Sequence, residues 1–78
     1  MNEWEQLISQ LKDADWRVRV RAAEMLEYAG DVRAVEPLIG LLSDNDEWVR
    51  YYTRWALGEI GTPNALDALR RWQEENKG

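Results

Sequence analysis

The chain repeats itself with a period of 31 residues, and this repeat limits its possible folds more than any other feature. When the sequence is shifted by 31 positions, Leu7 falls on Leu38 and Gly30 falls on Gly61. Periods of this length are typical of proteins that stack identical helical units side by side. Further identical pairs are Glu5/Glu36, Ile8/Ile39, Leu11/Leu42, Asp13/Asp44, Asp15/Asp46, Val18/Val49, Arg19/Arg50, Leu26/Leu57, Ala34/Ala65 and Leu38/Leu69.

The spacing of apolar residues and the residues that begin and end helices predict five helices. Asp15 and Asp46 are suited to N-cap positions, and Gly30 and Gly61 follow the last helical residue, where glycine is favoured. Thr62 is a further N-cap candidate, with proline at the first helical position behind it. The predicted helices cover Asn2–Lys12, 16–29, Val32–Leu42, 47–60, and a last segment from Pro63 that carries Leu66, Leu69 and Trp72 before a polar tail, Glu74–Gly78.

Pro37 lies inside the third predicted helix, beyond the first turn, where its missing N–H is tolerated. We therefore expect a bend or a late helix start in this segment.

The segment DVRAVEPLIGLLSDNDEWVRYYTRWALGEIG, residues 31–61, resembles a HEAT-like repeat of the phycobilisome-lyase type, and the resemblance covers nearly all of residues 3–73. The segment is also similar to the artificial alphaRep scaffolds. The resemblance implies an all-α, right-handed solenoid of helical hairpins, with first helices on the convex side and second helices on the concave side. The expected organisation is a single domain, 1–78, with repeat 1 at about 1–30, repeat 2 at about 31–61 and a half repeat at 62–78.

Composition excludes several classes of function. The net charge of −5 argues against nucleic acid and anionic membranes as partners, because both attract excess Lys and Arg. Without cysteine or histidine, thiolate and imidazole chemistry are absent. We therefore predict no catalysis, no cofactor and no metal. The chain shows neither a signal peptide nor a membrane span. We expect a cytoplasmic protein, and the lack of cysteine equally fits a recombinant, engineered one.

Large aromatic residues occupy positions of the second helices that the apolar stripe leaves free. Along 47–60, the stripe is formed by Val49, Thr53, Ala56 and Leu57, yet four other positions hold tryptophan or tyrosine. Tyr, Trp and Arg are enriched at interface hot spots. The resemblance implies that these positions vary within the family. We therefore predict a protein- or peptide-binding face formed by Trp16, Arg17, Val20, Arg21, Tyr28, Trp48, Tyr51, Tyr52 and Trp55.

Other interpretations of the aromatic residues compete with this one. They could pack within the chain, or join two copies into a homo-oligomer, so that the chain acts as a self-assembling unit. A fragment of a bilin-lyase-like enzyme is a further alternative. It would have to bind bilin, and we expect no bilin binding. The Asp15/Arg19 and Asp46/Arg50 pairs are interpreted as structural, because they recur in register. In that interpretation each Asp caps its helix and each Arg meets a carboxylate of the neighbouring turn.

Overall fold

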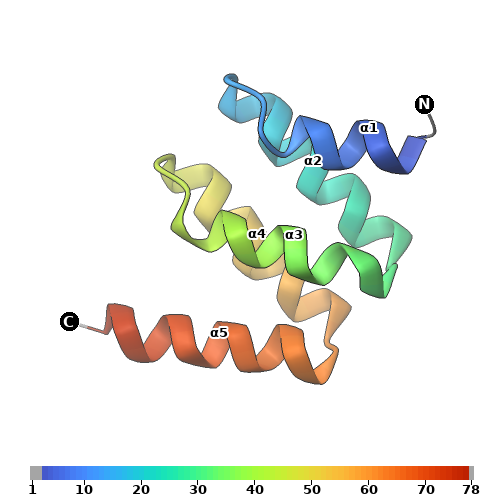
Figure 1. The fold of residues 1–78 in the computed structure, drawn as a ribbon. Coiled ribbons are helices and arrows are strands. Elements are labelled where there is room, and N and C mark those ends of the chain that lie inside the picture. The colour runs from blue at the N-terminus through green and yellow to red at the C-terminus, as the bar shows by residue number, and fades with distance from the viewer. Residues whose placement is uncertain (1–2, 78) are drawn as a thin grey trace.

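The helices stack in two layers in the computed structural model, which describes residues 3–77. The first layer holds α1, α3 and α5, and the second holds α2 and α4 behind them (Figure 1). The described residues contain no strand, so the predicted all-α solenoid of five helices is confirmed. The α-helices are α1 (Glu3–Gln10), α2 (Trp16–Ala29), α3 (Val35–Gly40), α4 (Glu47–Ile60) and α5 (Pro63–Asn76).

Both helices of the second layer begin and end as the sequence predicts. The Asp15 side chain accepts a hydrogen bond from the Arg17 N–H at 2.9 Å, and Asp46 accepts one from the Trp48 N–H at 2.8 Å. Each carboxylate thereby satisfies a helix N–H that has no partner within its own helix. At the other ends, Gly30 and Gly61 adopt φ values of 64° and 68°. Left-handed backbone of this kind favours glycine, because a side chain would clash.

The third predicted helix starts late, and this confirms one of the two expectations for Pro37. A 3₁₀ turn, η1 (Val32–Ala34), precedes α3, and a second 3₁₀ turn, η2 (Leu41–Ser43), follows it. Pro37 is the third residue of α3, where the N–H would have no intrahelical acceptor. The proline therefore costs no hydrogen bond of the helix.

The outer helices differ from their predicted limits. In α1 the helix ends at Gln10, while Asn2 lies outside the described residues. The predicted polar tail was wrong for 74–76, because α5 continues to Asn76. The Asp67 carboxylate pairs with Arg70 and Arg71, one turn further along. These contacts and the helix-forming residues of the segment favour an extended α5.

The core lies between the two layers, and α2 and α4 form its most extensive helix pair. Leu26, Leu38 and Leu57 are its largest fully buried side chains. Thr53 is also fully buried, and its hydroxyl donates a hydrogen bond to the Val49 carbonyl at 2.7 Å. A buried hydroxyl with such a partner carries little penalty. The threonine therefore serves as a core residue of α4.

Leu66 is half exposed, although it is one of the apolar residues that the sequence places on α5. Its counterpart one repeat earlier, Val35, is fully buried. The difference follows from position, because α3 has a first-layer neighbour on each side whereas α5 has one on a single side (Figure 1).

Candidate functional site

The exposed side chains of α2 and α4 form one face of the second layer, which we call the α2–α4 face. Trp48 is 54% exposed and Trp55 is 50% exposed, although both stand on a helix that supplies much of the core. Tyr51 is equally half exposed, and Tyr28, near the end of α2, is 88% exposed. Large aromatics left this open are an exception in a small monomer and mark surfaces that contact other molecules.

Three rings at the start of α4 hold one another in place. The Tyr51 ring meets the Trp48 ring edge to face, with centroids 6.1 Å apart, and meets the Tyr52 ring in the same way at 5.4 Å. Edge-to-face contacts at these distances are attractive, because the positive edge of one ring faces the negative face of the other. The rings therefore present a surface with restricted side-chain motion.

Two of the predicted face residues are not free surface. Val20 is 9% exposed and belongs to the core, so its prediction as a partner contact was wrong in this respect. Tyr52 is partly buried and packs against the core. Both remain structural supports of the face, whereas Trp16 and the other aromatics contribute open area.

A hollow of about 380 Å³ lies between α2 and α4 on this face. We call it the α2–α4 hollow. Three of its lining residues lie outside the predicted face, and one of them, Met25, is a half-exposed apolar side chain. The repeat alignment pairs Met25 with Ala56, a fully buried core position, and so gave no signal for it. The hollow is lined by Glu24, Met25, Glu27, Tyr28, Tyr52 and Trp55.

Some charged side chains of the face form ion pairs within the chain and others do not. The Arg17 guanidinium pairs with Asp15 at 3.2 Å, and the hydrogen bond from this side chain lowers the pKa of Asp15 below its usual value. Arg21 is exposed and, within residues 3–77, takes part in no ion pair. Glu24 and Glu27 likewise take part in no ion pair within these residues. The predicted arginines therefore differ, since Arg17 is neutralised by its own helix cap and Arg21 is not.

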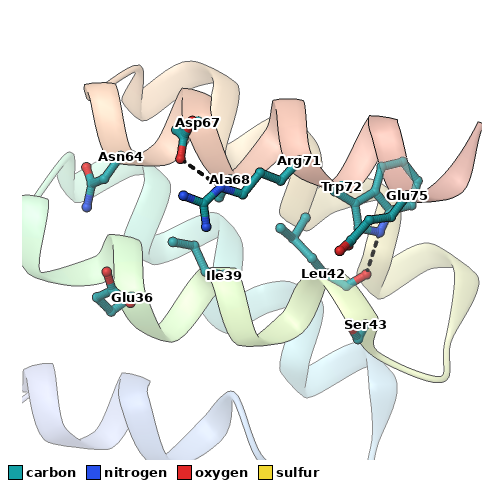
Figure 2. Close-up of a pocket in the computed structure, with 10 residues that line it drawn as sticks. All are labelled: Glu36, Ile39, Leu42, Ser43, Asn64, Asp67, Ala68, Arg71, Trp72 and Glu75. Atoms are coloured by element: carbon teal, nitrogen blue, oxygen red, sulfur yellow. Dashed lines mark hydrogen bonds and ion pairs between the residues drawn. The ribbon is translucent and has the colours of Figure 1, made fainter.

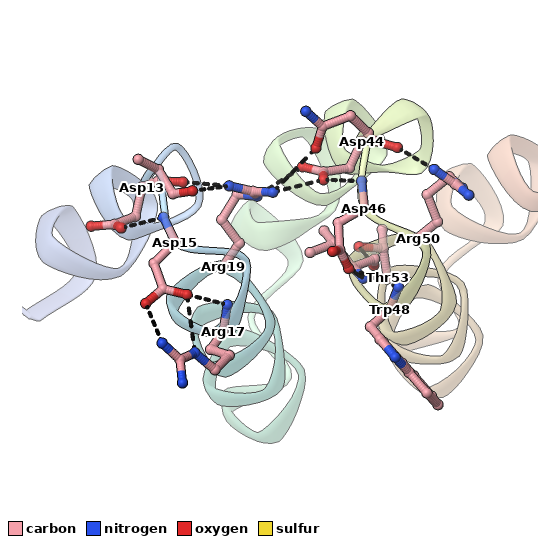
Figure 3. A network of polar contacts seen from close by, with 12 residues as sticks. Asp13, Asp15, Arg17, Arg19, Asp44, Asp46, Trp48, Arg50 and Thr53 are labelled. Atoms are coloured by element: carbon pink, nitrogen blue, oxygen red, sulfur yellow. Dashed lines mark hydrogen bonds and ion pairs between the residues drawn. The ribbon is translucent and has the colours of Figure 1, made fainter.

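Of the other repeated Asp and Arg residues, Arg19 and Asp44 join the two repeats, whereas Arg50 bonds within its own repeat (Figure 3). Arg19 donates to the Asp13 carbonyl at 2.6 Å and to the Asp44 carboxylate at 3.0 Å. Its Nε lies 3.0 Å from the other Asp44 oxygen, close enough for an ion pair but not aligned for a hydrogen bond. Arg50 donates to the Asp44 carbonyl at 2.7 Å, so the carboxylate expected for it is replaced by a backbone oxygen. These residues link turns and form no reactive site.

A second hollow, of about 470 Å³, lies in the other layer between α3 and α5 (Figure 2). Three of its polar side chains already have partners within the chain. Arg71 pairs with Asp67 at 3.0 Å, and the Trp72 Nε1–H donates to the Leu42 carbonyl at 3.1 Å. This hollow is the larger one, but none of the predicted face residues lines it, whereas Tyr28, Tyr52 and Trp55 line the α2–α4 hollow. We therefore regard the α2–α4 face as the candidate site.

Residues 3–77 contain neither a metal-binding group of side chains nor a helix that could span a membrane. No group of three or more Asp, Glu, His or Cys side chains is placed to hold a metal ion. No helix in this part of the chain is long and apolar enough to cross a membrane.

The fold and the site define an α-solenoid whose second helices carry an open aromatic face. The chain belongs to the family of HEAT repeats, whose model matches residues 4–77. HEAT repeats generally mediate protein–protein interaction, and the family is typically non-enzymatic. The predicted resemblance to HEAT repeats is thereby confirmed, while the lyase-type subgroup stays a prediction. A search of curated proteins gives no match.

Proposed function

We propose that the chain is a non-catalytic protein-interaction module that binds a protein or peptide segment across the α2–α4 face. The carrying observation is the exposure of Trp48, Tyr51 and Trp55, each about half open on one helix. Aromatic side chains of this kind bury much apolar area on binding and have few torsions to restrict. The same property serves a natural adaptor and an engineered scaffold equally.

The contacts among the rings support this proposal. Because Tyr51 packs edge to face against both Trp48 and Tyr52, a partner meets rings whose freedom is already reduced. Less side-chain entropy is then lost on binding, and more of the gain from burial appears as affinity.

A random-peptide library displayed on phage and selected against the full chain tests the proposal. Selected peptides should lose binding to a Tyr51→Ala/Trp55→Ala variant whose helical circular dichroism is unchanged. Leu66→Ala is the matched control, because Leu66 is equally exposed but lies on α5, outside the face. Peptides that bind the double variant as tightly as the parent chain would contradict the proposal.

Self-association through the same face is a second candidate, because exposed aromatics also join identical chains. Two copies would each bring a net charge of −5, which opposes their approach. Multi-angle light scattering across a dilution series decides between the candidates. A strict monomer at the highest concentration removes this second one, and a concentration-dependent dimer that the Tyr51→Ala/Trp55→Ala change abolishes supports it.

A further inference from the structure

This inference rests on the proposed function and names the chemistry of the partner. We infer that the α2–α4 hollow receives a lysine or arginine side chain from the bound segment. Three properties of the hollow support a cation: its carboxylates, the end of α2 beside it, and its aromatic walls.

The first property is unpaired negative charge. Glu24 and Glu27 both line the hollow, and no ion pair within residues 3–77 engages either carboxylate. The nearest exposed arginine of the face, Arg21, stands one turn earlier on α2 and is not among the lining residues. The hollow therefore offers two carboxylates to a cation that the chain itself does not supply.

The second property is the carboxyl end of α2. Helix carbonyls give this end a partial negative charge, which a cation stabilises. The last turn of α2 contains no basic residue, although this is where lysine and arginine are favourable. Glu27 and Tyr28 lie in this turn and also line the hollow. A bound cation would thus meet the helix end and the carboxylates together.

The third property is the apolar wall formed by Met25, Tyr28 and Trp55. Ring faces attract a cation, and the methylene stem of Lys or Arg packs on apolar surface. The chain forms the same kind of contact elsewhere within residues 3–77, and one of these contacts places Arg54 6.0 Å from the centre of the Tyr51 ring. Arg33 lies 4.4 Å from the centre of the Trp4 ring, and Arg54 lies 4.5 Å from that of Trp72.

Charge also distinguishes a basic segment from other occupants. A second copy would bring five further negative charges to a hollow that is already acidic. The α3–α5 hollow is lined by the carboxylates of Glu36 and Glu75 too, but it already contains a cation of the chain, Arg71, whereas no Lys or Arg of residues 3–77 lines the α2–α4 hollow. Attraction between a basic segment and this acidic chain would in addition speed association at low salt.

Two short peptides of one sequence test the inference, Ac-Gly-Ala-Arg-Ala-Gly-NH2 and the same peptide with neutral citrulline in place of arginine. Each is titrated into the ¹⁵N-labelled full chain by NMR. The arginine peptide should shift the Trp55 indole signal and the amides of residues 24–28. It should bind about two- to fivefold more tightly than the citrulline peptide, a difference that shrinks as salt is added.

A Glu24→Gln/Glu27→Gln variant should bring the two affinities to nearly the same value while circular dichroism stays unchanged. Glu36→Gln is the matched control, because Glu36 is exposed and lines the α3–α5 hollow instead. It should leave the difference intact.

Equal binding of the two peptides at Trp55 would overturn the inference and leave the proposed function standing, because the face would still bind peptide. Arginine-dependent shifts confined to the α3–α5 hollow, or no shift with either peptide, would overturn it as well. Library peptides that bind the face without enrichment in Lys or Arg would count against the cation alone. A library that yields no face-dependent binder would count against the proposed function itself.

Discussion

The Arg19 guanidinium of α2 and the Asp44 carboxylate before α4 form an ion pair at 3.0 Å that crosses from one repeat to the next. Both side chains are largely buried, with 12% and 10% of their area exposed. The pair is therefore shielded from solvent and fixes the spacing between the two second-layer helices.

Removal of this arginine should destabilise the fold. In an Arg19→Met variant the Asp44 carboxylate loses its charged partner while mostly buried, which should lower the free energy of unfolding by about 2–3 kcal/mol. Urea unfolding followed by circular dichroism measures the change. Arg17→Met is the control, because its ion pair with Asp15 is exposed to solvent and its loss should lower the free energy of unfolding much less. Equal losses in the two variants would contradict the special role of Arg19.

Two glycine-to-alanine substitutions should change the stability of the fold in opposite directions. Gly61→Ala forces a side chain onto a left-handed backbone, with φ at 68°, and should cost about 1 kcal/mol. Gly40→Ala falls on a helical backbone, with φ at −60°, and its new Cβ meets nothing within 4 Å. It should stabilise by about 0.5–1 kcal/mol, because the unfolded chain loses freedom. Thermal unfolding should give a lower midpoint temperature than the parent chain for Gly61→Ala and a higher one for Gly40→Ala. Midpoints that shift in the same direction would contradict this prediction.

Two tryptophan-to-phenylalanine changes separate structural from surface aromatics. Trp72→Phe removes the indole N–H that donates to the Leu42 carbonyl, and should cost about 1 kcal/mol or more. Trp55→Phe keeps a ring on the open face and should change the free energy of unfolding by less than about 0.5 kcal/mol. Urea midpoints of the two variants provide the test. A larger loss for Trp55→Phe would assign that ring to the core.

Stability should fall in acid through two helix-start carboxylates. Arg17 lowers the pKa of Asp15, and Arg33 lowers that of Asp31, mainly through side-chain hydrogen bonds. A pKa that is lower in the folded chain contributes stability above the usual value of 3.8, and this contribution is lost as the pH falls through the folded pKa. The loss should therefore appear below about pH 4.

An Asp15→Asn/Asp31→Asn variant keeps an acceptor at both caps but carries no charge there. Its urea midpoint should fall less steeply than that of the parent chain between pH 5 and pH 2. Glu59→Gln is the control, since Glu59 is exposed and forms no ion pair within residues 3–77. A slope unchanged by the double substitution but changed by the control would contradict the assignment.

The fold was predictable because local signals and the repeat agree. Asp46 and Gly61 mark the limits of α4 through caps that act on their own neighbours, and the same pattern recurs 31 residues earlier. The exposure of a single residue depends on more than the local pattern. Leu66 has the apolar character of Val35, and only its place at the edge of the stack exposes it.

The site was predictable in outline and not in detail. Helical spacing identified Trp48, Tyr51 and Trp55 as exposed, but it also placed Val20 on the face. Whether a side chain at the border of an apolar stripe is buried or exposed depends on a rotation of the helix about its axis by a few tens of degrees. The sequence does not specify this rotation. Met25 was missed because its counterpart one repeat later, Ala56, is a buried core residue. The hollow itself depends on the gap between two helices and has no signature in either one alone.

Arg50 holds the same place in its repeat as Arg19, yet it meets a backbone carbonyl and, within residues 3–77, no carboxylate. In the part of the chain that the structure describes, its guanidinium therefore lacks the carboxylate partner that Arg19 has in the next repeat. A further copy of residues 31–61 inserted after Gly61 would bring an aspartate to this guanidinium. The lengthened chain should then be joined at the new junction as it is at the existing one. Each added unit would extend the binding face by one helix. The number of repeats would therefore set the length of the partner segment that the face can contact.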